Sequence, residues 1–592
     1  MPETSLDDLL LQNPNAPTND EFALHFARRL YAPREERDEE RLLLGLAEDR
    51  REFEASDDEQ VEWCGEASRG LLDAVLASNL LSSEARSEIN AMMEDAAPTL
   101  ERTKTIGHFR FQWTETSSDV RDNTNETNID ATAAVLNDCW NRYVTDFRQP
   151  QAALIGGQRV LDVEVYFDPS LHGSTSSPTN RIFLNSETVV NDDCRRQTTS
   201  AHELFHRVEY TYGYVTGTAG QRWWVEALGS WSQEYYAPAI DDYISRVNGG
   251  LANPSLGLFD RSYDACHYWK YLGEQLAQRS SAVGTERRAI REVLDEYSTN
   301  GLNAKAASGS ITQNRLTRSF DLFFQDWTKA NYLKDLIGSG AHYDYAEDET
   351  VTTGCGRTNG PYGHVAPDSD ETIVSNTFNW SSGTIIINAY GTRAHHFDIA
   401  SSVTDLEIRF AGNAGGGAGI YSAHLIMIKA NRWQVIYNSV SVTERSWQLT
   451  LAAGQYDRCL LVINGLMTGG PYEVTVNPCV SGSWRDSYGY IWTLIQTGTT
   501  ISGTVVTTSC GTYSVTGTVS EGGDIVLEAT GACCDFTYRG SVVDCATASG
   551  EWTNDCGGQG TWNMTKIDPS EASEVLENEP EEYADDPATM RS

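Results

Sequence analysis

Ser200-Ala-His-Glu-Leu-Phe-His-Arg-Val-Glu-Tyr210 is the segment around which this chain of 592 residues is built. His202 and His206 are four residues apart, so on a helix both imidazoles lie on one face, one turn apart, and can reach the same metal ion. Glu203 follows the first histidine and can reach a water on that ion. Farther along, Glu226 offers the third ligand of a His-His-Glu site that keeps one position open for water. The spacing therefore predicts a metal site carried by two helices.

The sequence around Glu226 supports the same interpretation. Glu226, Ser230 and Gln233 fall on one face of the helix predicted over residues 223–236, so the ligand and two hydrogen-bonding side chains point the same way. A short apolar strand predicted at Arg181–Asn185 precedes the first helix and could present an edge to an extended peptide. The tryptophans beside Glu226 favour core packing over substrate binding. The alternative for the two histidines is a pair on the surface of a solvent-exposed helix.

His-Glu-x-x-His with a glutamate twenty residues later resembles the gluzincin metallopeptidases, which include thermolysin and the zinc aminopeptidases. The Trp-x-x-Glu-Ala form around the glutamate is similar to secreted bacterial and archaeal gluzincins, and the resemblance covers about residues 105–335. It implies that His202, His206 and Glu226 bind Zn²⁺ and that Glu203 is the general base. In this family the metal lowers the pKa of its water and the glutamate takes and then passes on the proton.

The resemblance also implies a donor for the oxyanion of the reaction. Zinc aminopeptidases carry a tyrosine at the start of a helix after the ligand helix, and the segment 262–272 looks like that motif. Tyr263 is therefore the candidate, with His267 on the next turn as the alternative. Two departures stand out. Ser230 occupies the position where the thermolysin branch has an aspartate that orients a histidine, and no Gly-x-Met-Glu-Asn motif is present, so an endopeptidase is favoured.

The charge of the chain is strongly negative. It has 84 acidic residues against 44 lysines and arginines, a net charge of −40. Such a balance argues against nucleic-acid binding, which needs a basic surface. It is typical of proteins from salt-adapted organisms and equally of soluble acidic secreted proteins, and both interpretations stay open. No run of about 18 apolar residues exists, so no membrane span is predicted.

Cysteine usage bears on where the protein acts. Five of the 12 cysteines lie between residues 510 and 556, which favours disulfides and an oxidising compartment. A second metal site is the competing interpretation, but no Cys-x-x-Cys pair is present, and the adjacent Cys533 and Cys534 could pair with each other only under strain. The start of the chain has no visible signal peptide, which conflicts with export. The cysteines predict a secreted or cell-surface protein all the same.

The length predicts about three or four domains. Strand, helix, strand and strand patterns before the His202 helix favour an α+β metallopeptidase domain, whereas later regions alternate like β-strands. A polar stretch at Asp122–Asp130 lacks the glycine of a calcium loop and is predicted to be a solvated loop. The predicted domains are a helical N-terminal segment at 1–104, the gluzincin-like domain at 105–340, a linker at 341–372, a β-sandwich at 373–479, a small antiparallel barrel of the lipocalin or avidin type at 480–567, and an acidic disordered tail at 568–592. The N-terminal segment is either a support layer or a pro-segment over the active site.

The sequence thus predicts a zinc-dependent metallopeptidase that acts on a protein or peptide substrate, with Zn²⁺ as its cofactor. The two β-domains are expected to bind substrate or a surface, or to assist folding. Two alternatives from other classes remain. One is a catalytically inactive binding or adhesion protein built on a metallopeptidase-like domain, and the other is a zinc hydrolase of a non-peptide substrate.

Overall fold

The computed structural model describes most of the chain. The described residues are 82–85, 87 and 99–567, with breaks at 169–170, 176–179, 215–220, 300, 302, 337–342, 347–350, 355–356, 375–377, 379, 404, 415, 417, 478–479, 498, 508–509, 521–523 and 545–546. The acidic tail predicted at 568–592 lies outside them, and so does nearly all of the helical segment predicted at 1–104. The described part divides into two compact units. The first consists of the described residues within Met1–Asn253, Leu258–Asn331 and Ala341–His364, and the second of those within Pro254–Gly257, Tyr332–Gly340 and Val365–Ser592.

The first unit begins with a mixed sheet in the strand order β1-β2-β4-β6-β5, with β3 paired to the other end of β4. The strands β2, β4 and β6 run parallel, whereas β1 and β5 pair antiparallel at the two edges. Phe109, Phe111 and Trp113 of β2 are buried and alternate with half-buried residues, as expected for a strand with one covered face. The bounds are β1 Arg102–Ile106, β2 Phe109–Trp113, β3 Ala153–Ile155, β4 Gln158–Tyr166, β5 Gly173–Thr175 and β6 Arg181–Asn185.

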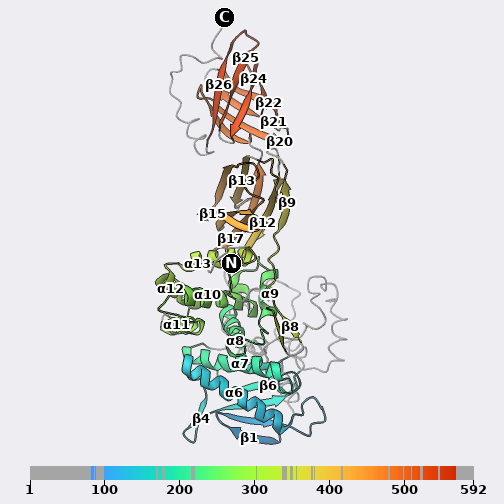
Figure 1. Cartoon of the computed structure of the whole chain (residues 1–592), viewed down its shortest axis with the longest axis vertical. Helices are drawn as coiled ribbons and strands as arrows, with labels where there is room; N and C mark the ends of the chain where they lie inside the picture. The colour runs from blue at the N-terminus through green and yellow to red at the C-terminus, as the bar shows by residue number, and fades with distance from the viewer. Residues whose placement is uncertain are drawn as a thin grey trace. The chain divides into compact units, whose positions relative to one another are not determined.

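Helices α6 and α7 pack on this sheet, and α8 packs on α7, with the remaining helices beyond (Figure 1). None of the described helices is long and apolar enough to cross a membrane. The helices are α6 Glu126–Asp146, α7 Asp193–Glu209, α8 Arg222–Tyr236, α9 Ile244–Ala252, α10 Cys266–Arg279, α11 Glu286–Thr299, α12 Ala304–Leu316 and α13 Phe320–Leu333, with a π-helical turn η2 Ser186–Val190 and the short 3₁₀ helices η3 Tyr210–Tyr212, η4 Leu258–Asp260 and η5 Tyr263–Ala265.

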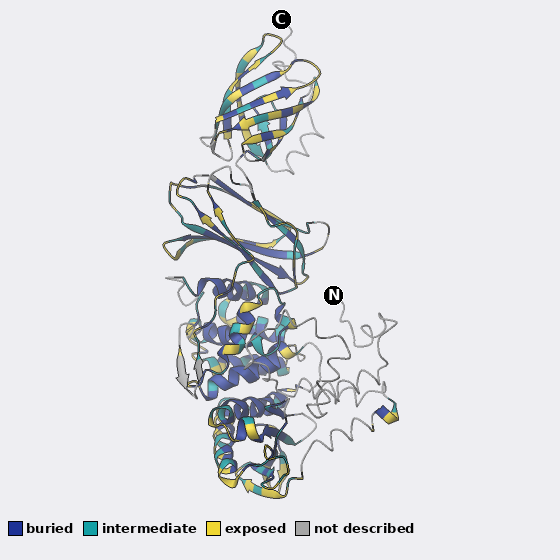
Figure 2. Cartoon of the chain, turned by 90° about the vertical axis from the view of Figure 1, so that its right-hand side faces the viewer, coloured by how far each residue is buried: buried dark blue, intermediate teal, exposed yellow. Residues whose placement is uncertain are grey.

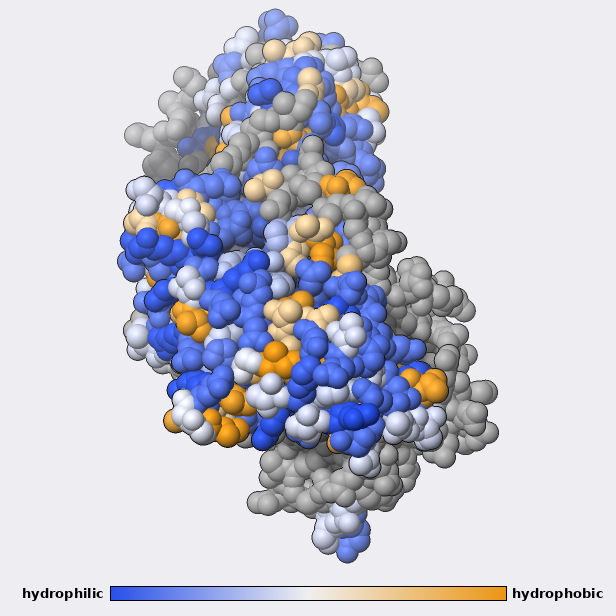
Figure 3. All heavy atoms as spheres, turned by 60° about the horizontal axis from the view of Figure 1, so that its bottom comes forward, coloured by the Kyte–Doolittle hydropathy of each residue, from blue (hydrophilic) through white to orange (hydrophobic). Residues whose placement is uncertain are grey.

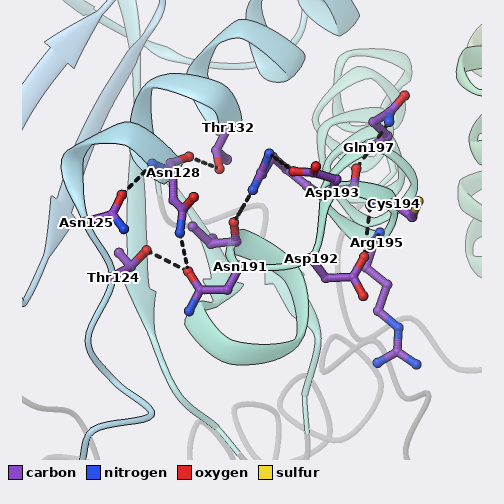
Figure 4. Close-up of polar contacts among 12 residues, drawn as sticks. Thr124, Asn125, Asn128, Thr132, Asn191, Asp192, Asp193, Cys194, Arg195 and Gln197 are labelled. Carbon is purple, nitrogen blue, oxygen red and sulfur yellow. Dashed lines mark hydrogen bonds and ion pairs between the residues drawn. The ribbon is translucent and has the colours of Figure 1, made fainter. Parts of the chain in front are cut away.

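The polar stretch at Asp122–Asp130 is not the solvated loop predicted from the sequence, because α6 begins within it. Asn125 caps the helix by accepting a hydrogen bond from the Asn128 amide at 2.9 Å. The side chains of Thr124 and Asn128 both donate to Asn191 Oδ1, just before α7 (Figure 4). These polar residues therefore hold the starts of two helices together. Their role is helix capping, which the spacing rules of a calcium loop do not reveal.

The first unit buries most of the surface of its central helices (Figure 2). Trp223 lies 5.2 Å from Trp269 and Trp224 lies 4.4 Å from Tyr297, measured between ring centroids, and all four rings are buried. These tryptophans pack in the core, as predicted. The face drawn in Figure 3 is mostly hydrophilic with small, separate hydrophobic areas, which is the ordinary surface of a water-exposed domain.

The predicted linker at 341–372 contains regular structure. Strands β7 Thr352–Gly354 and β8 Arg357–Asn359 form a two-stranded hairpin. Tyr362 is buried in the first unit, where its hydroxyl lies 2.7 Å from that of Tyr243. Buried aromatic side chains fix this stretch to the helices, a packing effect that its Gly-rich and Thr-rich composition does not reveal.

The second unit contains a β-sandwich and a barrel. The sandwich has one sheet in the order β10-β18-β13-β16, with β11 also on β18, and another in the order β15-β14-β17-β12-β9. Apolar side chains from both sheets fill the space between them. The bounds are β9 Ser369–Ile373, β10 Trp380–Ser381, β11 Ile385–Ile387, β12 Thr392–Ile399, β13 Asp405–Gly412, β14 Ile420–Lys429, β15 Arg432–Val442, β16 Glu444–Thr450, β17 Arg458–Leu466 and β18 Gly470–Asn477.

The barrel predicted at 480–567 is confirmed: strands β19 to β26 form a closed antiparallel barrel. Trp484, Trp492 and Trp562 are fully buried in its core. Disulfides join Cys510 to Cys533 and Cys534 to Cys556, so the adjacent cysteines take separate partners. The bounds are β19 Gly482–Asp486, β20 Ile491–Thr497, β21 Thr500–Thr507, β22 Gly511–Val519, β23 Asp524–Thr530, β24 Phe536–Asp544, β25 Thr547–Asn554 and β26 Gln559–Ile567.

A buried histidine makes the stability of the sandwich depend on pH. His395 is fully buried between the Ser369 and Tyr472 hydroxyls, and burial, helped by the charge of Arg393, lowers its pKa to about 4. The unfolded chain takes up a proton near pH 6.5, so this stability is present above pH 6.5 and lost as the pH falls toward 4, by about 3 kcal/mol in all. The free energy of unfolding in urea is expected to be lower at pH 5 than at pH 7 in the wild type. His395→Gln should remove most of this difference between the two pH values. An equal pH dependence in both proteins contradicts this assignment.

Candidate metal centre

Two packed helices bring the predicted ligands together. His202 and His206 lie on α7 and Glu226 lies on α8, and all three are buried. Glu226 Oε2 is 3.4 Å from His202 Nε2 and 3.8 Å from His206 Nε2. One ligand atom from each residue lies within 4.8 Å of the others. These separations suit three ligands around a single ion.

Local features of both helices create this arrangement. Asp192 caps α7 by accepting hydrogen bonds from the backbone N–H groups of Cys194 and Arg195, which stabilises the start of the helix that carries both histidines. On α8, Gly229 faces the His202 ring, and a Cβ at this position would lie 2.6 Å from His202 Cε1. The missing side chain lets α8 approach α7 closely enough for Glu226 to reach both imidazoles.

The electrostatics of the cluster suit a cation. Burial, reinforced by the charge of Arg246, lowers the pKa of His202 to about 3, and burial with His202 nearby lowers the pKa of His206 to about 3. Both imidazoles are therefore neutral at physiological pH, which is the form that binds metals. Burial raises the pKa of Glu226, against the attraction of His206 and a hydrogen bond from Tyr263. A bound cation would reverse that shift and hold Glu226 ionised.

Two ligand atoms in the cluster lack a hydrogen bond. His202 Nε2 and Glu226 Oε2 are buried and form no hydrogen bond with any residue that the structure describes. Buried polar atoms without such a bond are costly, at about 1–3 kcal/mol each. A cation between them would satisfy both, and two imidazoles with one carboxylate form a donor set that Zn²⁺ binds with an open fourth position. The residues therefore fit zinc.

A glutamate that was not predicted from the sequence orients one of the histidines. Glu209 is fully buried, and its Oε2 lies 2.8 Å from His206 Nδ1, so the ring nitrogen can donate to it and leave Nε2 toward the other ligands. Ser230, considered for a similar role, instead donates to the Glu226 backbone carbonyl at 3.0 Å. The signal was available, because Glu209 is three residues after His206 on the same helix face.

Glu203 lies beside these side chains and lines an open pocket. It is fully buried, and a Cβ on Gly173 would lie 2.8 Å from its Cγ, so strand β5 approaches it only because residue 173 is glycine. The pocket is lined by His172, Gly173, Arg195, Thr199, His202, Glu203, Gln233, Asp242 and Arg246.

The strand at Arg181–Asn185 does not present the sheet edge. It forms β6, and β5 pairs with it antiparallel, so β5 takes the edge position within the described sheet. Gly173 and Ser174 are in this edge strand, and Gly173 belongs to the pocket lining. Strand β5 was not predicted because three residues are too few to give an alternating pattern.

Of the two candidate oxyanion donors, Tyr263 reaches the centre. Its hydroxyl hydrogen bonds to the Glu226 carboxylate, its ring centroid is 5.9 Å from that of His202, and the Arg246 guanidinium lies 4.6 Å above the ring. His267 is buried elsewhere. Its Nδ1 donates to the backbone carbonyl of Asp264, and its ring packs 4.7 Å from Trp327. Neither residue is in the lining of the pocket beside Glu203. The hydrogen bond from Tyr263 to Glu226 is what favours Tyr263 over His267.

Comparisons with known proteins add little. No protein-family model matches the chain, and no curated protein matches it. Among solved structures, the pre-peptidase C-terminal domain of a collagenase from Bacillus anthracis is 12% identical over 19% of this chain and 100% of that one, with a TM-score of 0.13. A periplasmic inhibitor of g-type lysozyme from Aeromonas hydrophila is 11% identical over 19% of this chain and 98% of its own, also with a TM-score of 0.13. Scores this low carry no argument about fold or function.

Replacing Glu209 with glutamine is expected to weaken zinc binding by about 10–100-fold, because the amide holds the His206 ring less firmly and makes its nitrogen less basic. The measurement is zinc affinity by competition with a chromophoric chelator. Glu187→Gln, at an exposed glutamate, is the matched control and should match the wild type. Equal affinities in all three proteins would mean that Glu209 does not tune the site.

Proposed function

We propose that this chain is a zinc-dependent metallopeptidase, and that it cleaves within peptide chains as an endopeptidase. The observation that carries the proposal is the convergence of His202, His206 and Glu226 beside the buried Glu203, at the edge of an open pocket. Zn²⁺ is the proposed cofactor, held by the three converging side chains. When bound, it would supply Lewis-acid chemistry, polarising a carbonyl and lowering the pKa of a water.

In this proposal the protein's own residues handle the protons. Glu203 accepts the proton of the attacking water at a carboxylate oxygen and then delivers it to the departing amine nitrogen. The Tyr263 hydroxyl is hydrogen bonded to Glu226 in this structure. During the reaction it would donate instead to the carbonyl oxygen of the substrate, which gains negative charge as the carbonyl carbon is attacked. The burial of Glu203 and both histidines limits competing water, which strengthens each of these interactions.

The two alternatives are weaker on the same observations. An inactive binding protein would have no need of a buried carboxylate beside a complete ligand set, and Glu203 has that position here. A zinc hydrolase of another substrate would use the same centre. The short edge strand β5 beside the pocket favours a peptide, because an extended chain can add to a sheet edge.

The proposal places the protein outside the cell or on its surface, and the disulfides of the barrel are compatible with that setting. The sandwich and the barrel would then bind the substrate or a surface.

Zinc content and casein hydrolysis, measured on the same purified full-length protein, test the proposal. We expect about one zinc per chain, casein cleavage within the chain, loss of cleavage after chelation, and recovery on adding zinc. Stoichiometric zinc without hydrolysis of any peptide would overturn the peptidase assignment. A protein that binds no zinc would overturn the metal site as well.

A further inference from the structure

The pocket beside Glu203 has a cationic side that the proposed reaction does not need. Arg195, on the first turns of α7, and Arg246, on α9, both line it. The remaining charged side chains of the lining are Glu203 and Asp242, and Asp242 Oδ2 accepts a hydrogen bond from Thr198 at 3.1 Å. Zinc would add two positive charges next to this pocket, against one anionic ligand. The positive charges of the protein at the pocket wall are those of Arg195 and Arg246.

A hydrogen bond to His172 orients the Arg195 side chain. Its Nη1 donates to His172 Nε2 at 3.2 Å, and His172 Nδ1 lies 2.7 Å from the Thr188 hydroxyl. Because a guanidinium only donates, His172 Nε2 must accept, and Nδ1 carries the ring proton toward Thr188. A chain of two hydrogen bonds thus orients the planar guanidinium at the pocket wall. A guanidinium fixed in this way matches a carboxylate, since its donors form a fork that pairs with two oxygens.

Arg246 lines the same pocket. Its guanidinium lies over the Tyr263 ring, and the Tyr263 hydroxyl hydrogen bonds to Glu226, so Arg246 lies near the candidate metal centre. Gln233 of α8 completes the lining with a different chemistry. It is buried, and its Oε1 has no hydrogen-bond partner among the described residues. An amide oxygen aimed at a pocket suits a backbone N–H of a bound peptide.

From this geometry we infer that Arg195 and Arg246 form a subsite for a carboxylate of the substrate, next to the bond that is cut. The inference rests on the proposed peptidase function and specifies its substrate class. The carboxylate is that of an aspartate or glutamate side chain, or of a free C-terminus, because both present the same pair of oxygens. The overall charge of −40 does not forbid this, since charges beyond about 8 Å are screened at physiological ionic strength.

The test compares matched internally quenched peptides that differ at one position, with Asp, Asn, Ala or Lys there, each made with a free or an amidated C-terminus. We expect kcat/KM for the best Asp peptide to exceed that of its Asn counterpart by at least about 10-fold. In Arg195→Gln the Asp-to-Asn ratio should fall to near one, whereas Arg288→Gln, at an exposed arginine of α11, should keep the wild-type ratio. A preference for the free acid over the amide, lost in the same variant, would assign the subsite to the C-terminal carboxylate.

Two results would separate failure of this inference from failure of the proposed function. Peptides cleaved equally well with Asp and Asn at every position would overturn the subsite and leave the peptidase assignment standing. If no peptide is cleaved at all, the same labelled peptides can be titrated into the zinc-loaded full-length protein by fluorescence anisotropy. Tighter binding of the Asp peptide, weakened at least about 10-fold by Arg195→Gln, would support the subsite independently of activity, and equal binding would overturn it.

Discussion

Replacing Glu203 with glutamine is expected to lower kcat on casein or a peptide by about 10²–10⁴-fold, the usual contribution of a general base. KM and zinc affinity should change little, because the proposed role of Glu203 lies in the reaction and not in holding the metal or the substrate. Glutamine keeps the shape of glutamate. It therefore fits the tight space against Gly173, where a Cβ on that glycine would lie only 2.8 Å from Glu203 Cγ.

The measurement is steady-state kinetics with zinc content determined on the same samples. Glu187→Gln, at an exposed glutamate, is the matched control for the chemical change. Retained activity with full zinc would assign the base to another residue. Loss of both zinc and activity would mean that Glu203 supports the ligands and is not a separate base.

The convergence of His202, His206 and Glu226 beside Glu203 could be predicted from the sequence, because most of this geometry is set within single helices. The four-residue spacing of His202 and His206 fixes their common face as soon as a helix forms, and Glu226 needs only a second helix in contact. The barrel was also predictable, since its short strands alternate and its tryptophans recur near both ends.

Contacts that depend on tertiary packing were beyond the sequence. Gly229 gives no signal until α8 is placed against the His202 ring, and the three residues of β5 show no periodicity. The pairing of Arg195 with His172 joins positions 23 residues apart through the fold. Glu209 is the exception, because its spacing of three residues from His206 places both side chains on one helix face.

Burial distinguishes this site from a generic pair of helical histidines. Exposed histidines on a helix keep their ordinary pKa, so protons compete with a metal ion for their ring nitrogens. Here burial lowers the pKa of both, and the same burial leaves Glu226 Oε2 without a hydrogen bond from the described residues. The folded chain thus carries a buried cluster of polar atoms whose cost a bound cation would lower, and the proposed metal site would link metal binding to stability.

That link makes Glu226→Gln the sharpest test of the metal site. Burial raises the pKa of Glu226, so without metal the pocket favours an uncharged side chain. Glutamine resembles that uncharged form, and the metal-free variant should therefore be at least as stable as the metal-free wild type. Glutamine is also a poor zinc ligand, so affinity should fall by more than about 100-fold, beyond the effect of losing an orienting residue.

Thermal unfolding of the full-length protein, with and without zinc, separates these effects. Zinc at 100 times the dissociation constant should stabilise the wild type by about 2.7 kcal/mol, whereas Glu226→Gln at the same zinc concentration should gain almost nothing. Glu203→Gln should gain as much as the wild type, because it keeps all three ligands. If Glu226→Gln gains the full stabilisation, the ion is held by other residues and the His202–His206–Glu226 centre is wrong. If zinc stabilises none of the three proteins, the buried cluster is not a metal site, and its buried polar atoms are a structural cost that the fold bears unrelieved.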